Sequence, residues 1–341
     1  MGVQISEILP KKTIEVDDLK GRTLAVDAFL WLYQFLSIIR QQDGTPLMDS
    51  KGRITSHLSG IFYRNAKLLS AGIRPVWVFD GKSPPFKAGT IAQRSEAKNE
   101  AVQEWRAAIA EGNVEAARRA AQGAVFLTSE IIEQSKQLLT YMGIPVVQAP
   151  SEGEAQCAQL CKEGTVWAVA SQDADSLLFG SPRLIRNLSV YGRRKVPRKN
   201  VYVEVKPELI ELKNIFSSLS LTQDQLIFVG LLVGTDFNPG ISGFGPKRSL
   251  ELARKLKTID EFKASVKWDF DVQPEEIFDF FKNPPVEKNV KILFSKPQPE
   301  KIISMLVDEF EFSEERISNT LNEIKSSFDS SNLSSSLLRW K

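Results

Sequence analysis

Histidine and cysteine are scarce in this chain of 341 residues, which contains one His and two Cys. The single histidine, His57, excludes metal sites built on several imidazoles, and also a serine triad unless His57 serves in it. Cys157 and Cys161 lie one helical turn apart, so we expect two small residues on a buried helix face and no disulfide. A reducing cytoplasm fits this usage, and the chemistry must then depend on carboxylates, Lys, Arg and Tyr.

Long apolar runs and a large net charge are also lacking. The longest apolar run, 226–233, is interrupted by Gly230 and is far shorter than the roughly 20 residues of a membrane span, so we expect no membrane contact. With 42% hydrophobic and 25% charged residues, the composition is typical of a soluble globular protein of one large or two ordinary domains. Because the net charge is only +2, a polyanionic partner would have to bind local basic patches.

Two local patches of Lys and Arg are present. Residues 183–199 contain seven basic residues and no acid, and residues 246–257 contain five against Glu251 alone. Such a run is usually a solvated face, and a nucleic-acid-binding surface is the alternative; two runs in a nearly neutral chain favour nucleic acid. The basic residues are Arg183, Arg186, Arg193, Arg194, Lys195, Arg198 and Lys199 in the first patch, and Lys247, Arg248, Arg254, Lys255 and Lys257 in the second.

Two acid-x-acid pairs, Glu152 with Glu154 and Asp173 with Asp175, flank a short predicted helix and an apolar strand. Each pair has a structural explanation. Ser151 and Glu154 fit a capping box, and the two Asp residues fit a turn after a strand. The functional alternative is a site for hard cations such as Mg²⁺, since converging carboxylates repel one another by about 1 to 4 kcal/mol per pair.

Three apolar strands, 23–27, 75–80 and 166–173, each end in an acid, and helical patterns follow the first two. Alternating strands and helices predict βαβ units in a mostly parallel sheet whose ligands bind at the carboxyl ends of the strands. Residue 236 closes the apolar stretch 226–233 and joins the group if the chain returns there. The predicted cluster is Asp27, Asp80, Glu152, Glu154, Asp173, Asp175 and Asp236.

Two further segments have functional candidates. Residues 82–128 are rich in Ala, Arg, Lys and Glu but poor in large apolar residues, so we expect a protruding, mobile helical segment with Lys87 and Arg94 over the acidic edge. The turn 243–246 places Pro246 at a helix start followed by Lys247 and Arg248, which favours phosphate binding over an ordinary helical hairpin.

The C-terminal region is predicted to contain a helix at 313–328 and a disordered Ser-rich tail from Ser326. This tail ends in an apolar tip containing Leu337 and Trp340, which a disordered tail has no reason to carry unless a partner binds it.

Taken together, these motifs resemble those of the flap endonucleases of the structure-specific 5′-nuclease superfamily, archaeal or eukaryotic in type, over nearly the whole chain. The motifs are 26–28 (VDA), 33–36 (YQFL), 55–58 (TSHL), 78–82 (VFDGK), 149–155 (APSEGEA), 171–175 (SQDAD) and 243–248 (GFGPKR). The resemblance implies an α/β fold with a central, mostly parallel sheet flanked by helices (PIN-like), a helical arch at 82–128 and a helix-two-turn-helix element at about 226–257. One nuclease domain would cover 1–325, with an N-terminal region at about 1–100, an internal region at 140–257 and a flexible tail at 326–341.

The resemblance also assigns roles. The seven carboxylates bind two divalent cations, Mg²⁺ with Mn²⁺ as a substitute. Lys87 and Arg94 contact the scissile phosphate, Tyr33 stacks on an unpaired base, and the free amine of Gly2 lies near the active site. A potassium ion binds backbone carbonyls of the helix-two-turn-helix. The residues assigned to DNA binding are Gly2, Thr55, Arg64, Arg193, Arg194, Lys195, Gly243, Gly245, Lys247 and Arg248.

A structure-specific 5′ flap endonuclease with 5′–3′ exonuclease activity is therefore expected, leaving a ligatable nick in DNA. The alternatives are a 5′ exonuclease or excision-repair endonuclease of the same superfamily, or a non-catalytic scaffold that binds DNA junctions. The family's sliding-clamp motif is matched only by Leu337 and Trp340, because Ser334 and Lys341 replace its Gln and last aromatic residue. We expect a cytoplasmic, nucleoid-associated monomer.

Overall fold

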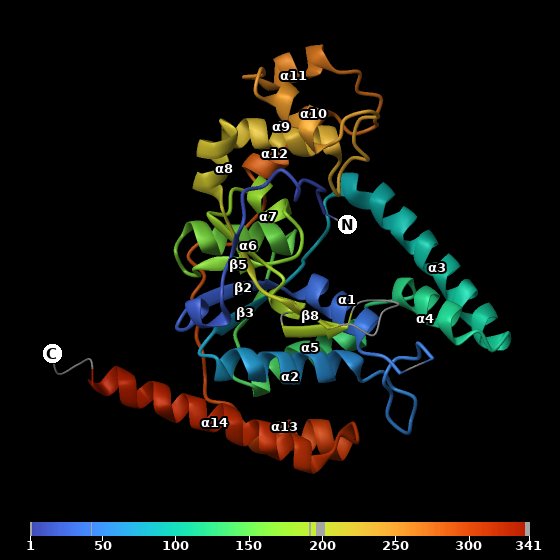
Figure 1. Cartoon of the computed structure of the whole chain (residues 1–341), viewed down its shortest axis with the longest axis vertical. Helices are drawn as coiled ribbons and strands as arrows, with labels where there is room; N and C mark the ends of the chain where they lie inside the picture. The colour runs from blue at the N-terminus through green and yellow to red at the C-terminus, as the bar shows by residue number, and fades with distance from the viewer. Residues whose placement is uncertain (1, 42, 191, 196–201, 338–341) are drawn as a thin grey trace.

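The computed structural model describes residues 2–41, 43–190, 192–195 and 202–337 and centres on a seven-stranded sheet of order β1-β9-β6-β5-β2-β3-β4 (Figure 1). In this order, each neighbouring pair from β6 through β5, β2 and β3 to β4 is parallel. Strand β9 is antiparallel to β6, and β1 is antiparallel to β9. The predicted α/β fold with a mostly parallel sheet is confirmed. The strands are β1 (Lys12–Thr13), β2 (Thr23–Asp27), β3 (Arg74–Phe79), β4 (Val146–Gln148), β5 (Ala168–Ala170), β6 (Arg183–Arg186) and β9 (Glu208–Glu211).

Two hydrophobic cores cover the opposite faces of this sheet, because successive side chains of a strand point to opposite sides. Along β2, Ala25 packs in one core while Leu24 and Val26 pack in the other. The first core contains α6 (Gly153–Lys162), α7 (Asp175–Leu178), α8 (Leu212–Leu219), α9 (Gln223–Val233), α10 (Pro246–Ala253), α11 (Ile259–Ser265) and α12 (Pro274–Lys282). The second contains α1 (Ala28–Ile38), α2 (Ser56–Ser70), α5 (Ser129–Tyr141), α13 (Pro299–Ile303), the π-helix η4 (Ser304–Glu309) and α14 (Glu314–Leu337).

The described part also contains three short 3₁₀ segments: η1 (Val16–Leu19), η2 (Pro85–Lys87) and η3 (Leu188–Val190). Cys157 and Cys161 are buried on α6 and unpaired, as the sequence predicts. No single helix in the described part is long and apolar enough to cross a membrane, and the bent pair α8 and α9 meets those limits only when taken together.

Helices α3 (Ala88–Ala110) and α4 (Val114–Gly123) project from the sheet as a helical arch (Figure 1). Their buried residues are three alanines, Ala108, Ala117 and Ala121. The arch therefore buries little apolar surface, and its helices depend on intrinsic propensity and on their contact with each other. This matches the protruding helical segment that the sequence predicts.

The C-terminal helix is longer than predicted. α14 continues through Leu337, so the predicted helix end at Phe328 and the disordered tail from Ser326 are wrong for the described backbone. Its first part packs in the second core through Ile317, Leu321 and Ile324. Once packing has nucleated a helix, each further residue adds a hydrogen bond at little cost, so a Ser-rich sequence can continue it.

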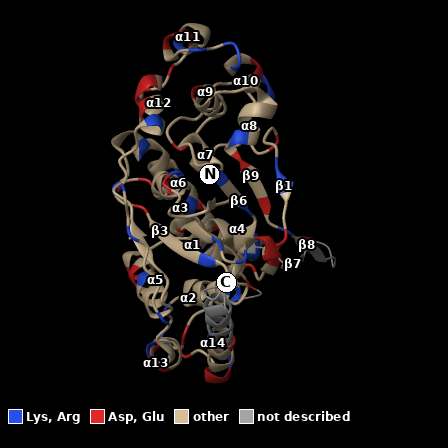
Figure 2. Ribbon diagram, turned by 90° about the vertical axis from the view of Figure 1, so that its left-hand side faces the viewer, with Lys and Arg blue, Asp and Glu red and all other residues tan. Residues whose placement is uncertain are grey.

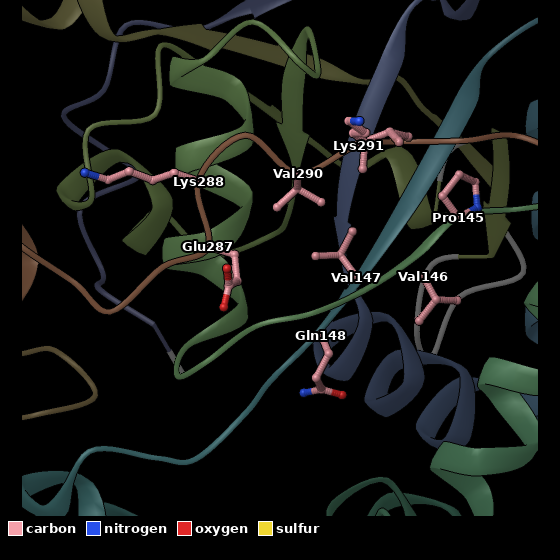
Figure 3. A pocket seen from close by; sticks show the side chains of 9 residues that line it. Pro145, Val146, Val147, Gln148, Glu287, Lys288, Val290 and Lys291 are labelled. Carbon is pink, nitrogen blue, oxygen red and sulfur yellow. The ribbon is translucent and has the colours of Figure 1, made fainter.

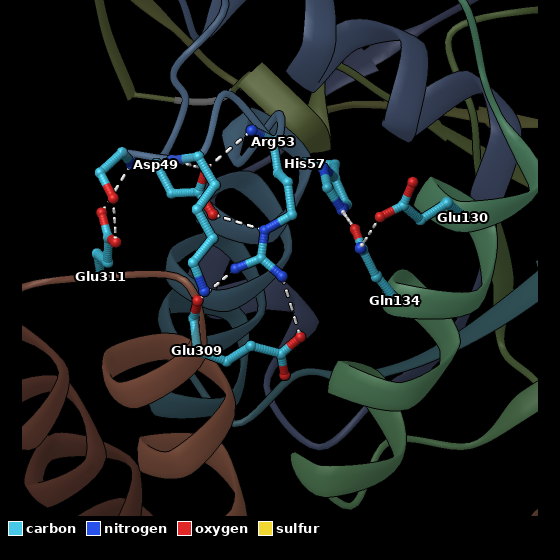
Figure 4. Close-up of polar contacts among 9 residues, drawn as sticks. Asp49, Arg53, His57, Glu130, Gln134, Glu309 and Glu311 are labelled. Atoms are coloured by element: carbon cyan, nitrogen blue, oxygen red, sulfur yellow. Dashed lines mark hydrogen bonds and ion pairs between the residues drawn. The ribbon is translucent and has the colours of Figure 1, made fainter.

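The loop between α1 and α2 is fixed to the C-terminal region through Arg53 (Figure 4). Arg53 Nε lies 2.6 Å from Asp49 Oδ2, and its NH1 lies 3.3 Å from Glu309 Oε1. The guanidinium also lies 4.1 Å from the ring centroid of Phe310. These contacts hold the chain just before α2 against η4 and Phe310.

His57, on the buried face of α2, is 0% exposed, and its Nε2 lies 2.9 Å from Gln134 Oε1 (Figure 4). Among the described residues its Nδ1 has no hydrogen-bond partner. Burial lowers the pKa of His57 to about 4, because a charged ring would lose its hydration. The histidine is thus a neutral core residue.

In a His57→Gln variant, the free energy of unfolding should decrease less on acidification than in the wild type. In the wild type, the unfolded chain binds a proton at this histidine below its ordinary pKa of about 6.5, whereas the folded chain binds it only near 4. The free energy of unfolding therefore falls as pH falls through this window, by about 2 kcal/mol between pH 7 and 5. Urea unfolding should show a pH dependence smaller by that amount in His57→Gln, and equal dependence in both proteins would contradict a neutral His57.

Candidate active site

The predicted carboxylates lie at the carboxyl edge of the parallel strands. Asp27 ends β2, Asp80 follows β3, and the pairs 152/154 and 173/175 lie at the start of α6 and after β5. Asp236 follows α9, so the apolar stretch before it is a helix rather than a further strand. Hydrogen bonds, ion pairs and electrostatic repulsion link all seven: Asp27, Asp80, Glu152, Glu154, Asp173, Asp175 and Asp236.

Helix α6 is capped by Asp80 from a different element. Asp80 Oδ1 accepts a hydrogen bond of 2.5 Å from Gly153 N, the first residue of α6. The predicted capping box of Ser151 with Glu154 is wrong, since Glu152 occupies the N-cap position without a side-chain cap. Glycine allows this approach, because a Cβ at residue 153 would lie 2.5 Å from Asp80 Oδ1. The negative charge of Asp80 at a helix N-terminus is itself favourable.

Ser171 connects two of the acids. Its Oγ donates to Glu154 Oε1 at 2.9 Å and accepts from Asp173 N at 3.2 Å. Burial, and then repulsion from Asp175, raises the pKa of Glu154 well above its usual value, and the Ser171 hydroxyl opposes this shift. The serine therefore holds Glu154 and the turn of Asp173 in one arrangement.

The N-terminal segment binds the other side of the same turn. Gly2 N donates to Asp173 Oδ2 at 3.1 Å, and Val3 N donates to Asp175 Oδ1 at 2.6 Å. A Cβ at residue 2 would lie 2.6 Å from Asp173 Cβ and 2.7 Å from Asp175 Oδ2, so only glycine fits. Gly2 thus lies beside the carboxylates, where the sequence resemblance places it.

Lys87 and Arg94, from the base of the arch, reach the acids. Lys87 Nζ lies 2.5 Å from Glu152 Oε2 and 3.3 Å from Asp236 Oδ2, and the Arg94 guanidinium pairs with Asp236. Although burial alone would lower it, Glu152 and Asp236 raise the pKa of Lys87, so it stays charged. Burial would raise the pKa of Asp236, but Lys87 and Arg94 outweigh it and hold this pKa low.

Burial and repulsion act together on the remaining acids. Burial, and then Glu152, raises the pKa of Asp80 to about 6. Burial, and then Asp236, raises the pKa of Asp175 to about 7. The pKa of Asp27 lies well above its usual value because of burial and then Asp80. Added positive charge would relieve this repulsion.

The donor set suits hard divalent cations, because oxygen ligands are those that Mg²⁺ prefers. Cys157 is close to the cluster, but burial raises the pKa of its thiol, so it stays protonated. Within the described ranges, no three Asp, Glu, His or Cys side chains surround a single metal position as they stand. A cation bound here would compete with Lys87 and Arg94 for the carboxylate oxygens of Glu152 and Asp236.

Tyr33 on α1 contacts the arch. Lys98 Nζ of α3 donates to Tyr33 Oη at 2.8 Å and lies 4.4 Å from the centroid of its ring. The same ammonium lies 6.0 Å from the ring centroid of Phe126, after α4. Tyr33 therefore joins the sheet-bound helix α1 to the arch.

The predicted phosphate-binding turn begins α10, with Gly245 at the N-cap and Pro246 at the first helical position. Gly243 has a φ of +82°, and its carbonyl accepts a hydrogen bond of 3.2 Å from Arg248 NH1. Lys247 and Arg248 are exposed beside this turn, where Figure 2 shows basic residues on α10. The helix start thus presents two cations to solvent.

The remaining predicted DNA-binding residues lie on two other elements. Thr55 is the N-cap of α2, and Arg64 lies within that helix. Residues 193–195 lie on β7 (Gly192–Lys195), which pairs with β8 (Tyr202–Val205), but the side chains of Arg193, Arg194 and Lys195 and residues 198 and 199 are outside the described part. Arg183 and Arg186 instead bind the carbonyls of Trp167 and Gln172, at 3.1 and 3.0 Å, and so anchor loops.

Comparison with known proteins identifies the family. Residues 1–101 match the XPG N-terminal domain, and residues 143–236 match the XPG I-region. Flap endonuclease 1 of Pyrococcus furiosus is 53% identical over 97% of this chain and 96% of its own length. The chain belongs to the flap endonuclease 1 family.

Solved structures agree with this membership. The flap endonuclease-1 from Methanococcus jannaschii has a TM-score of 0.76 and 39% identity, with 97% of this chain and 100% of that chain covered. The catalytic core of Rad2, solved in complex with a DNA substrate, has a TM-score of 0.70 and 25% identity over 95% of this chain and 100% of its own. This flap endonuclease family member is therefore a nuclease of the XPG superfamily.

Two supporting residues were missed at the sequence level. Ser171 lies two positions before Asp173 at a strand end, which was a usable signal for a hydroxyl near the acids. Gln148, at the end of β4, had no such signal. Its Nε2 donates to the carbonyls of Phe79 and Asp80, at 3.2 and 2.7 Å, and so fixes the loop that carries Asp80.

Proposed function

We propose that this flap endonuclease family member cleaves 5′ flaps in DNA by two-metal phosphodiester hydrolysis, leaves a ligatable nick, and also acts as a 5′–3′ exonuclease. The observation that supports it best is the group of seven carboxylates, contacted by Lys87 and Arg94, at one edge of the sheet. These carboxylates would hold two Mg²⁺ ions, with Mn²⁺ as a substitute. When bound, the cations would activate water and stabilise charge on the departing oxygen.

The residues of the chain have distinct tasks in this reaction. Lys87 and Arg94 neutralise charge on the phosphate as it enters the site, because their donors already point at the acidic edge. The Gly2 and Val3 amides and the Ser171 hydroxyl keep Asp173, Asp175 and Glu154 oriented. Orientation of this kind avoids the cost of reorganising the site during the reaction.

DNA recognition is proposed to depend on shape and phosphate contacts. Lys247, Arg248 and the start of α10 would bind duplex phosphates without reading bases, together with a potassium ion held by nearby backbone carbonyls. The arch would receive the single strand, and Tyr33 would stack on an unpaired base. Residues such as Thr55, Arg64 and the β7 cations would add phosphate contacts.

Interactions beyond DNA rest on the C-terminal motif. We propose that Leu337 and Trp340 contact a sliding clamp. The structure does not describe Trp340 or the side chain of Leu337. We propose that the protein acts as a monomer in the cytoplasm, associated with the nucleoid.

Cleavage of labelled DNA tests the proposed function. With Mg²⁺, the protein should cut a 5′-flap substrate next to its junction much faster than a blunt duplex or a bubble. Preference for the blunt duplex would favour a 5′ exonuclease, and preference for the bubble would favour an excision-repair endonuclease. Tight binding of the flap without any cutting would show a junction-binding scaffold and overturn the proposal.

Replacing Ser171 by alanine should weaken metal binding by about tenfold, because groups that orient ligands are typically worth 10- to 100-fold in affinity. Ser176→Ala is the matched control, since this buried hydroxyl has no hydrogen-bond partner among the described residues. Calorimetric titration with Mn²⁺, without DNA, should show the loss only in Ser171→Ala, and Ser171→Thr should restore affinity. Equal affinities in the two alanine variants would remove the positioning role.

A further inference from the structure

Strand β4 is an edge of the central sheet, and a long connecting segment passes beside it. This segment, residues 283–298, links α12 to α13, and we call it the strap. A cavity of about 360 Å³ separates β4 from the strap, and Val147 and Val290 extend into it (Figure 3). Its lining also includes Pro145, Gln148, Lys288 and Lys291.

The strap is held at both ends of this cavity by hydrogen bonds to other elements. Gln156 of α6 donates to the carbonyl of Glu287 at 2.9 Å and accepts from its N–H at 2.7 Å. Further along, Ser295 N donates to Gly143 O at 3.1 Å. In the described part of the chain, no backbone hydrogen bond joins 146–148 to 287–292. The strap therefore passes the sheet edge without pairing with it.

The unpaired side of β4 presents backbone groups to this cavity. Trp77 N donates to Pro145 O, and Ala149 N donates to Phe79 O. In this parallel pairing, the backbone groups that form hydrogen bonds with β3 therefore belong to residues 145, 147 and 149. The peptide groups of Val146 and Gln148 must then face away from β3. The side chain of Gln148 binds the carbonyls of Phe79 and Asp80 and leaves this edge open.

The strap supplies positive charge next to the open edge. Lys288, Lys291 and Lys296 form no ion pair with any described residue, and Glu287 is the one acid between 283 and 298. In a strand that pairs with β4, successive side chains would alternate in direction. One set would face Val147 and Val290, and the other set would face these lysines.

We propose that the space between β4 and the strap binds an extended acidic segment of a partner protein, which adds to the sheet as a further strand. Backbone hydrogen bonds to Val146 and Gln148 provide the pairing, apolar side chains of the segment contact Val147 and Val290, and its acids pair with Lys288 and Lys291. This inference does not depend on the proposed nuclease reaction.

Charge argues against the other occupants. A second copy of the chain pairing through β4 would bring the same lysines together, and like charges across a strand pair are destabilising. A nucleic acid would use the lysines but would leave the outward peptide groups unpaired, and no aromatic side chain for stacking lines the cavity in the described part.

Amide exchange of the full chain tests the proposal with two capped seven-residue peptides, one alternating glutamate and valine and one alternating lysine and valine. The glutamate peptide should slow exchange at Val146 and Gln148 at least tenfold, and the lysine peptide should not. Reversing Lys288 and Lys291 to glutamate together should reduce affinity for the glutamate peptide at least tenfold. Lys325→Glu is the control, because it makes the same charge reversal on α14, away from the cavity, and this variant should bind the glutamate peptide with normal affinity.

Three results would overturn the inference. Equal binding of both peptides would show non-specific association, and binding without protection of Val146 and Gln148 would place the peptide elsewhere. Protection of these amides in the free protein, together with a dimer in light scattering, would identify a second copy as the occupant. Flap cleavage is measured separately, so failure here leaves the proposed function unaffected.

Discussion

Asp175→Asn is expected to reduce Mg²⁺-dependent cleavage of a 5′ flap by about a thousandfold or more, with little change in flap binding. Asp175 is 7% exposed, and its pKa is raised to about 7 by burial and by Asp236, so it gains strongly from a bound cation. Asparagine retains an oxygen that can accept the hydrogen bond from Val3 N, but it loses the negative charge. Single-turnover cleavage and DNA binding in Ca²⁺ would separate the two effects.

The same substitution should not unfold the protein. Removing one of several repelling carboxylates should leave the melting temperature without metal unchanged or raise it, since charge repulsion at a functional site costs stability. Asp260→Asn, at an exposed site on α11, is the control and should cleave normally. Wild-type cleavage by Asp175→Asn would remove this residue from the metal site.

Lys87→Ala is expected to slow cleavage by about a hundredfold while changing flap affinity by less than about threefold. Lys87 is 8% exposed and lies between Glu152 and Asp236, so its charge acts at the acidic edge and not on the exposed surface. A residue that stabilises charge developing in the reaction affects the rate more than the ground-state affinity.

Lys82→Ala is the matched control for this experiment, because Lys82 belongs to the same connection after β3 but is exposed. It should cleave at nearly the wild-type rate. If Lys87→Ala loses affinity and rate by the same factor, Lys87 binds DNA without stabilising the reacting phosphate.

Much of the fold could be predicted because its signals are local. Strands β2 and β3 are mostly apolar, and an acid stands at the end of β2 and directly after β3; a strand covered on both faces is expected to have such an apolar composition. The strand-end rule then placed Asp27, Asp80, Asp173 and Asp175 on one edge. Asp236 was included on the condition that the chain returns to this edge, and it does so through α9, a buried helix whose apolar sequence resembles a strand.

The side-chain partners were less predictable because they come from distant segments. Ser151 and Glu154 have the sequence pattern of a capping box, yet Asp80, directly after β3, accepts the hydrogen bond from the first residue of α6. Arg183 and Arg186 belong to a basic run, yet they bind loop carbonyls. The Ser-rich end of α14 reads as a tail, but the packed half of the helix determines its conformation. In each case tertiary contacts outweigh the local preference.

The contacts of Gly2 and Val3 have a consequence for synthesis of the protein. Gly2 and Val3 are synthesised before their carboxylate partners, which are 171 and 172 positions further along the sequence. Arg94 likewise meets Asp236 across 142 positions. Contacts between such distant residues form slowly because long loops must close first. A nascent chain that has not reached Asp236 lacks one of the acids, so the cluster cannot be complete until every strand of the central sheet and α9 have been made.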